Sequence, residues 1–240
     1  MLSIRLKEWC NSRKKMSQFF SSYRFGIFCL LIFAQYSCSS PYQIIDRPII
    51  FNEHRVEMTK KYIEDHYGLK VDDIKITPKI IVIHYTYIPT LEGSFQAFYN
   101  EELPSSRADL KKESQLNVSI QFLVSRAGKI YRLMPENHMA RHVIGLNYSS
   151  IGIENVGGTE DTPLTRAQIR ANKFLVEYLS KKHPISYVIG HSQYQNFENH
   201  PLWLEKNENY RTVKIDPGAK FLKAVHRKAR KLNLKTAEHE

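Results

Sequence analysis

Two histidines and one aspartate stand where apolar runs of the sequence end. His84 closes the run in IIVIHYT, His191 follows VIG, and Asp216 lies in KIDPG. In α/β domains, the edges where strands end bring side chains from different strands to one ligand. Two imidazoles and one carboxylate are a common protein ligand set for catalytic Zn²⁺ and leave the fourth tetrahedral position open for water. The three residues therefore predict a mononuclear zinc site in a hydrolase.

The predicted secondary structure around these residues alternates between strands and helices. Apolar runs and alternation predict strands at 80–86, 150–156 and 186–191, and a β-hairpin of 117–125 with 129–134. Apolar residues at helical spacing predict helices near 56–67, 94–103 and 165–183, and a terminal helix from about residue 219. The third helix opens with Thr165 and Gln168 at capping-box spacing. The pattern is typical of the α/β class.

Length limits the chain to one enzyme-sized domain. About two hundred residues remain after the N-terminal segment is set aside, enough for a single core but short for two full domains. We expect a signal peptide at 1–38, a tether and helix at 39–78, a catalytic domain at 79–232 and a polar tail at 233–240.

The first residues indicate export. Basic residues up to Arg24 precede the apolar run FGIFCLLIFA, which is too short to span a bilayer comfortably and is followed by small residues such as Ser37. This order predicts a secretory signal. Met16 begins a more conventional signal length, so the start codon stays open between Met1 and Met16.

All three cysteines lie in this leader, so the rest of the chain has no disulfide to form. The run AQYSCSS resembles a bacterial lipoprotein cleavage site, although Gln35 stands where that pattern usually has Leu. We therefore predict that Cys38 is lipidated and that the protein is a lipoprotein of the cell envelope, anchored to the membrane and facing the periplasm. An uncleaved anchor or a plain signal peptide is the alternative.

Charge adds little to this picture. The formal net charge is +11, and the six Lys/Arg and one Glu of residues 1–37 account for five of these charges, which leaves +6. Part of the excess lies in KAVHRKARKLNLK, whose spacing suits a solvated helix face. No recognised nucleic-acid motif accompanies the charge, so we expect no nucleic-acid partner. A monomer is the default expectation.

Five segments in order carry a family resemblance: IVIHYT, AGKIYRLMPE, ARHVIGLNYSSIGIENVG, VIGHS and KIDPG. Together they resemble the zinc-dependent N-acetylmuramoyl-L-alanine amidases of the peptidoglycan-recognition superfamily, over residues 79–232. The resemblance implies a single domain with a central mixed β-sheet flanked by helices. It also implies cleavage of the amide between N-acetylmuramic acid and L-alanine in peptidoglycan or muropeptides.

The resemblance assigns roles to single residues. His84, His191 and Asp216 match the ligands of one Zn²⁺. Glu154 matches the acidic residue that takes the proton of the attacking water, and Lys214 matches the cation two residues before the carboxylate ligand.

Other matched positions concern the substrate. His142 and Asn147 match polar positions of the substrate groove. Gln121 departs from the family, because many relatives have histidine or tyrosine there, and its amide can hydrogen-bond substrate but cannot act as acid or base. The stretch 192–213 is longer than usual, and its Trp203 can form an extra wall of the groove or only pack the insertion.

Three alternatives stay open. A peptidoglycan-binding recognition protein without catalysis typically lacks a zinc ligand, whereas all three ligands and Glu154 are present here. A cytoplasmic recycling amidase would not need the hydrophobic leader. A hydrolase for an unrelated amide cannot be separated by ligands alone, because a metal and a base set the reaction type but not the substrate.

Overall fold

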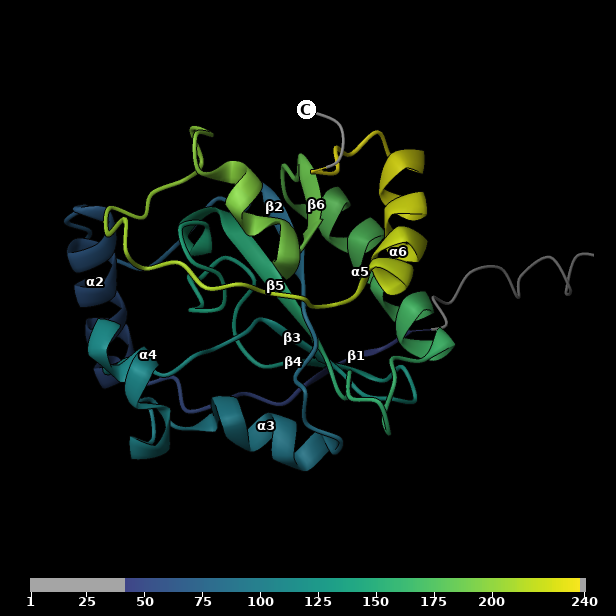
Figure 1. Cartoon of the computed structure of the whole chain (residues 1–240), viewed down its shortest axis with the longest axis horizontal. Coiled ribbons are helices and arrows are strands. Elements are labelled where there is room, and N and C mark those ends of the chain that lie inside the picture. The colour runs from purple at the N-terminus through teal and green to yellow at the C-terminus, as the bar shows by residue number, and fades with distance from the viewer. Residues whose placement is uncertain (1–41, 238–240) are drawn as a thin grey trace, which may run out of the picture. The chain divides into compact units, whose positions relative to one another are not determined.

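A six-stranded mixed sheet forms the centre of the computed structural model, which describes residues 42–237 (Figure 1). The strands are β1 (Ile44–Asp46), β2 (Ile80–Ile83), β3 (Phe122–Val124), β4 (Ile130–Arg132), β5 (Ser150–Asn155) and β6 (Tyr187–Gly190). Their order is β1-β4-β3-β5-β2-β6. β3 and β4 pair antiparallel, and the other neighbours pair in parallel. The predicted hairpin and the α/β class are confirmed.

Helices cover both faces of the sheet. They are α2 (Glu53–Tyr67), α3 (Leu91–Tyr99), α4 (Ala108–Glu113), α5 (Arg166–Lys182) and α6 (Ala219–Lys231), with 3-10 turns η1 (Ser105–Arg107), η2 (Asn147–Ser149) and η3 (His191–Phe197). Figure 1 shows α5 and α6 side by side, away from α2, α3 and α4. α5 begins with the predicted capping box, and Gly68 ends α2 at φ 66°, where glycine is favoured.

The alternation of β2 divides the core. Ile81 and Ile83 pack into the cluster formed with α5 and α6. Ile80 and Val82 point the other way and join a cluster with η3. All four are fully buried, and each such side chain contributes about 1.5–3 kcal/mol relative to its exposure. The face away from α5 and α6 is the one that receives the functional side chains.

Some predicted bounds differ from the structure. β1, a strand that the sequence analysis does not predict, joins the sheet beside β4. The helix predicted at 94–103 lies at Leu91–Tyr99 because Thr90 caps its N-terminus through its hydroxyl. α4 forms where the sequence analysis predicts neither a helix nor a strand.

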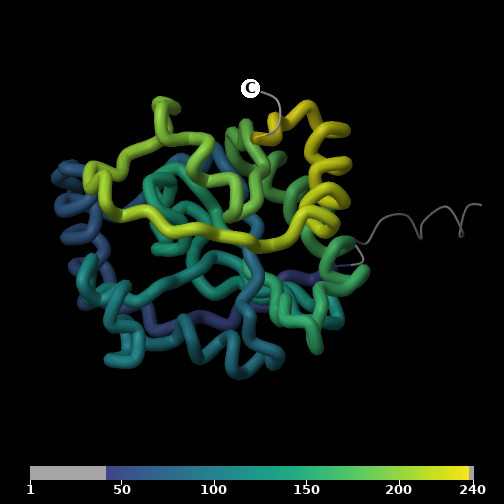
Figure 2. Tube along the Cα trace, viewed as in Figure 1, coloured from purple at the N-terminus to yellow at the C-terminus, as the bar shows by residue number. Residues whose placement is uncertain are grey.

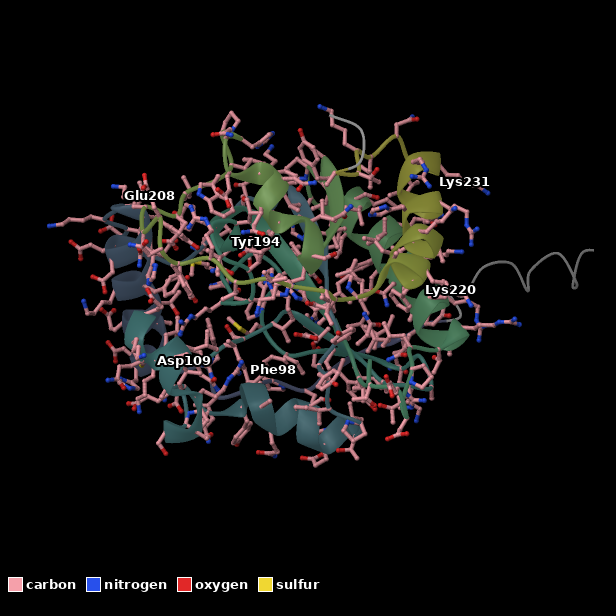
Figure 3. The ribbon with its side chains drawn as sticks, in the orientation of Figure 1. Phe98, Asp109, Tyr194, Glu208, Lys220 and Lys231 are labelled. Atoms are coloured by element: carbon pink, nitrogen blue, oxygen red, sulfur yellow. The ribbon has the colours of Figure 1, made fainter. Side chains whose placement is uncertain are left out.

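Several predictions lie outside the described residues. The signal peptide, the alternative start at Met16 and the lipidation of Cys38 all fall there. Within residues 42–237, helices long and apolar enough to cross a membrane are absent. The basic residues of α6 do form a solvated face, and Figure 3 labels Lys220 and Lys231 at the outer edge of this helix.

Candidate active site

The strand register brings three predicted residues into one row. Ile83, the last residue of β2, is level with its partners on β5 and β6. The next position along the three strands holds His84, Glu154 and His191. Strand alternation turns these side chains away from α5 and α6, since Ile83 faces those helices. Two proposed ligands and the proposed base therefore start from neighbouring strand ends.

Asp216 completes a triangle of potential ligand atoms. His84 Nδ1 and His191 Nδ1 lie 3.0 Å apart, and they lie 3.3 Å and 3.2 Å from Asp216 Oδ2. In a tetrahedral zinc site with bonds of about 2.0–2.1 Å, ligand atoms are about 3.3 Å apart. A hydrogen bond needs its donor to point at one acceptor, so three mutual contacts are poorly satisfied by protons alone. The three residues fit one metal ion held among them.

The electrostatics of the cluster suit metal binding. The three side chains come from residues only 1% to 8% exposed. Burial, together with the neighbouring His84, lowers the pKa of His191 to about 4. Burial opposes the charged form of Asp216, but the adjacent imidazoles of His191 and His84 outweigh it and hold the pKa of Asp216 well below its usual range. A neutral imidazole and an ionised carboxylate are the forms that ligate metals.

A long loop, residues 198–218, carries Asp216 across the end of the sheet (Figure 2). The Ser192 N–H donates to the Asp216 carbonyl at 2.9 Å, which fixes the loop beside His191. The hydroxyl of Tyr194, labelled in Figure 3, donates to the Thr212 carbonyl and accepts from the Thr212 N–H, both at 2.8 Å. These bonds hold the segment that leads into Asp216, the candidate carboxylate ligand.

Lys214 shares the inner side of this extended segment with Asp216. Both line the cavity, whereas Val213 and Ile215 are 88% and 72% exposed. This alternation follows from an extended backbone, in which residues two apart point the same way.

A cavity of about 410 Å³ opens above the cluster. The three candidate ligands, Glu154 and Lys214 line it. The remaining wall includes Tyr62, Phe98, Arg107, Leu110, Val143 and Thr212. The cavity is thus partly apolar with a few charged groups, as is usual for a binding site of this size.

Glu154 has an unusual environment for a carboxyl group. Its Oε2 is buried and has no hydrogen-bond partner among the described residues. Burial, and then the negative charge of Asp216, raise the pKa of Glu154 well above its usual range, while Lys214 and Arg107 oppose this rise. A raised carboxyl pKa beside a metal site is typical of a group that exchanges protons during catalysis.

A family model described as N-acetylmuramoyl-L-alanine amidase matches residues 75–219, more than half of the chain. The chain belongs to this amidase family. The match includes all three candidate ligands, Glu154 and Lys214. Enzymes of the family cleave the amide that joins N-acetylmuramic acid to L-alanine in peptidoglycan, and this is the activity of the chain.

Solved structures of related proteins are similar to this amidase. The N-acetylmuramoyl-L-alanine amidase LysC from Clostridium intestinale URNW is 20% identical, with 82% of this chain and 100% of that chain covered and a TM-score of 0.47. Bumblebee PGRP-SA is 20% identical, with 77% and 94% covered and a TM-score of 0.46. Human PGRP-IBETAC, in complex with glycosamyl muramyl pentapeptide, is 20% identical, with 53% and 86% covered and a TM-score of 0.39. Among curated protein sequences none matches the chain.

Two of the residues predicted to contact substrate lie on the cavity wall. His142 and Asn147 both line it. The Asn147 side chain is also engaged inside the protein, because its Oδ1 accepts from the backbone N–H groups of His142 and Val143 at 2.8 Å each. Its amide nitrogen donates to the Tyr67 hydroxyl at 3.1 Å.

The other two predicted substrate residues lie away from the cavity lining. Gln121 is fully buried, donates to the His138 carbonyl at 3.0 Å and accepts from the Gly152 N–H at 2.8 Å. Trp203 packs in the cluster with η3, and its ring fills the space where a side chain at Gly145 would lie. Their roles toward substrate stay predictions.

Sequence reasoning missed Arg107, Ser150 and Gly152. Arg107 lines the cavity from the end of η1, a short turn whose position no short-range pattern reveals. Ser150 and Gly152 lie on the face of β5 opposite Ile151 and Ile153, and a small polar residue and a glycine within a buried strand are a signal of close approach by another group. That signal marks a close approach without naming the group, which in the structure is the His142 ring.

Proposed function

We propose that this chain is a zinc-dependent N-acetylmuramoyl-L-alanine amidase in which His84, His191 and Asp216 hold one Zn²⁺. The observation that carries the proposal is the triangle of two Nδ1 atoms and one Oδ2 atom, 3.0–3.3 Å on each edge, on a cavity that Glu154 shares. The zinc, when bound, supplies Lewis acidity to the water and to the scissile carbonyl. The remaining chemistry belongs to side chains of the protein.

Glu154 acts as the general base and then as the general acid. Its carboxylate takes a proton from the attacking water and returns it to the leaving amine of L-alanine. The orphaned Oε2 and the raised pKa of Glu154 support this role, because a buried carboxyl without a fixed partner can accept a proton. No covalent link between enzyme and substrate is needed.

Lys214 stabilises the carbonyl oxygen as it gains negative charge. The side chain lines the cavity, and its positive charge acts on Glu154. A donor of this kind contributes on the order of 3 kcal/mol to transition-state stabilisation in hydrolases.

The substrate is peptidoglycan or a muropeptide. The proposal keeps His142, Asn147, Gln121 and Trp203 as candidates for substrate contact, with His142 and Asn147 supported by their places on the cavity lining.

The proposed setting is the cell envelope. Export through residues 1–38, a lipid anchor on Cys38 that faces the periplasm, and a monomeric state complete the proposal. Labelling cells with a fatty-acid probe tests the anchor: the wild type should carry label and Cys38→Ala should not. Label on both variants, or on neither, would contradict lipidation at this residue.

The proposed catalysis is tested with full-length protein and muramoyl-peptide fragments. Wild type should release an intact L-alanyl peptide, identified by mass. The activity should stop on chelation and return with zinc. Glu154→Gln should keep bound zinc while kcat falls about 10²- to 10⁴-fold, the usual contribution of a general acid or base. Zinc or muropeptide binding by wild type without any cleavage would assign the chain to recognition instead, and metal-independent cleavage would overturn the zinc site.

A further inference from the structure

A hydrogen-bond chain leads from His84 into the protein. His84 Nε2 lies 3.0 Å from His142 Nδ1, on the side of the ring away from the metal cluster. His142 Nε2 lies 3.3 Å from Ser150 Oγ, and Ser150 Oγ lies 2.8 Å from the Leu146 carbonyl oxygen. The four residues form an unbroken series of donors and acceptors that ends on the backbone.

The Leu146 end of this hydrogen-bond series determines the direction in which its protons point. A carbonyl oxygen only accepts, so the single proton of the Ser150 hydroxyl must point at Leu146. Ser150 can then only accept from His142, which places a proton on His142 Nε2. In a neutral imidazole, the other nitrogen is bare and accepts. His142 Nδ1 therefore receives the Nε2–H of His84.

His84, at the other end of the series, gives the same direction by an independent argument. The atom of His84 that faces His191 and Asp216 is Nδ1. A ligating nitrogen carries no proton, so the proton of neutral His84 must lie on Nε2. Both ends of the hydrogen-bond series therefore give the same direction, and no donor faces another donor along it.

The surrounding residues hold His142 in this place. Asn147 Oδ1 accepts the backbone N–H of His142 at 2.8 Å. Gly152 of β5 leaves room for the His142 ring, because a Cβ there would lie 2.9 Å from His142 Nδ1 and 2.1 Å from Ile120 Cδ1. Gly152 is itself held by Gln121, which accepts its N–H. Ring and backbone of His142 are both constrained.

We propose that His142 and Ser150 are positioning residues that hold His84 in the tautomer whose Nδ1 is free to bind metal. The inference rests on the proposed zinc site and adds to it a determinant of zinc affinity. Partners of metal-ligating histidines typically change metal affinity about 10- to 100-fold when they are removed.

A matched pair of variants in the full-length protein tests the proposal. His142→Leu and His142→Asn have similar shapes, but only the Asn side chain offers an oxygen near the position of Nδ1 to accept from His84. Zinc dissociation constants are measured by competition with a chelator. His142→Leu should bind zinc about 10- to 100-fold more weakly, and His142→Asn should stay close to wild type. Equal affinity of His142→Leu and wild type would overturn the proposal.

A measurement on unaltered protein covers the case in which a variant fails to fold. Nitrogen NMR of ¹⁵N-histidine-labelled wild type should show His84 protonated on Nε2 and His142 protonated on Nε2, with and without zinc. A proton on His84 Nδ1 in the metal-free protein, or zinc on His84 Nε2, would contradict the proposed direction of the hydrogen bonds. Wild type that binds no zinc would overturn the zinc site itself, whereas tight zinc binding with the wrong tautomer would overturn only the positioning role.

Discussion

Two buried histidine clusters in this amidase differ in what faces their ring nitrogens. In the candidate metal cluster, His84 and His191 turn nitrogens toward each other and share one carboxylate oxygen of Asp216. In the second cluster, His66 Nδ1 lies 3.0 Å and 3.1 Å from the two carboxylate oxygens of Glu205, and its Nε2 lies 3.1 Å from the Glu113 carbonyl. Both nitrogens of His66 face atoms that only accept, so both should carry protons.

The pKa shifts of the two clusters run in opposite directions. Burial and the neighbouring His84 lower the pKa of His191 to about 4. Burial also opposes the charged form of His66, but the hydrogen bond and charge of Glu205, with the Glu113 carbonyl, outweigh it and raise the pKa of His66. Burial alone therefore does not decide the charge of a histidine. The oxygens that face the ring nitrogens also matter: His66 faces three and forms an ion pair with Glu205, whereas His84 and His191 share one.

The ion pair of His66 and Glu205 fixes the loop that carries Asp216, the candidate carboxylate ligand. Glu205 lies on the long loop, and His66 lies on α2. Nearby, the Lys206 N–H donates to the His66 carbonyl, and Tyr210 packs on the His66 ring. The loop reaches Asp216 from this attachment point, so the second cluster supports the first.

Zinc content should differ most between variants of the two histidine clusters. His191→Ala should lose stoichiometric zinc and all measurable amidase activity, because two ligands remain where three are needed. His66→Asn should keep one zinc per chain. Metal analysis of both purified variants checks this difference. Retained zinc in His191→Ala, or zinc lost in a folded His66→Asn, would break the comparison.

A smaller effect is expected next to the metal cluster. Lys214→Met should leave zinc content unchanged and lower kcat about 10²- to 10³-fold, because a preorganised donor to the carbonyl oxygen is removed. Steady-state kinetics with a muropeptide measure the change. A rise in KM with unchanged kcat would instead indicate ordinary substrate binding by Lys214.

The smallest effect concerns stability and its dependence on pH. Glu205→Gln should lower the free energy of unfolding by about 1.5–3 kcal/mol at pH 6, the range for hydrogen bonds to charged groups. The pKa of His66 is raised on folding, so its contribution is fully present below about pH 6.5 and is lost as pH rises through the folded pKa. The difference between wild type and variant should therefore shrink toward high pH.

A surface pair on the same helix is the matched control. Lys61 and Asp65 form an exposed ion pair on α2, which should contribute only about 0.3–0.5 kcal/mol. Urea unfolding of Asp65→Asn should show little change and no dependence on pH near neutrality. A Glu205→Gln effect as small as this control would show that His66 and Glu205 behave like a surface pair.

Much of the fold could be predicted because its signals are local. The capping box at Thr165 and Gln168, the glycine after α2 and the alternation along β3 and β4 each act within a few residues. β1 was missed because its three residues become a strand only by pairing with β4. α4 was missed because its six residues show no buried face.

The site residues also fall into those that local patterns predict and those that depend on distant contacts. Strand ends predicted His84 and His191, and the row with Glu154 follows from strand register, which sequence patterns alone do not determine. The contacts of Gln121 and Asn147 depend on atoms brought from distant segments, such as the His138 carbonyl and the Tyr67 hydroxyl. The part played by Ser150 could not be predicted, because a serine in a strand gives no indication of which imidazole it will meet.

The most direct test of the account is a crystal structure of the zinc-loaded protein with anomalous data at the zinc edge. One anomalous peak per chain is expected, bonded to His84 Nδ1, His191 Nδ1 and an Asp216 oxygen, and none between His66 and Glu205. A peak at the His66 pair, ligation through Nε2 of either histidine, or no peak in active protein would contradict it.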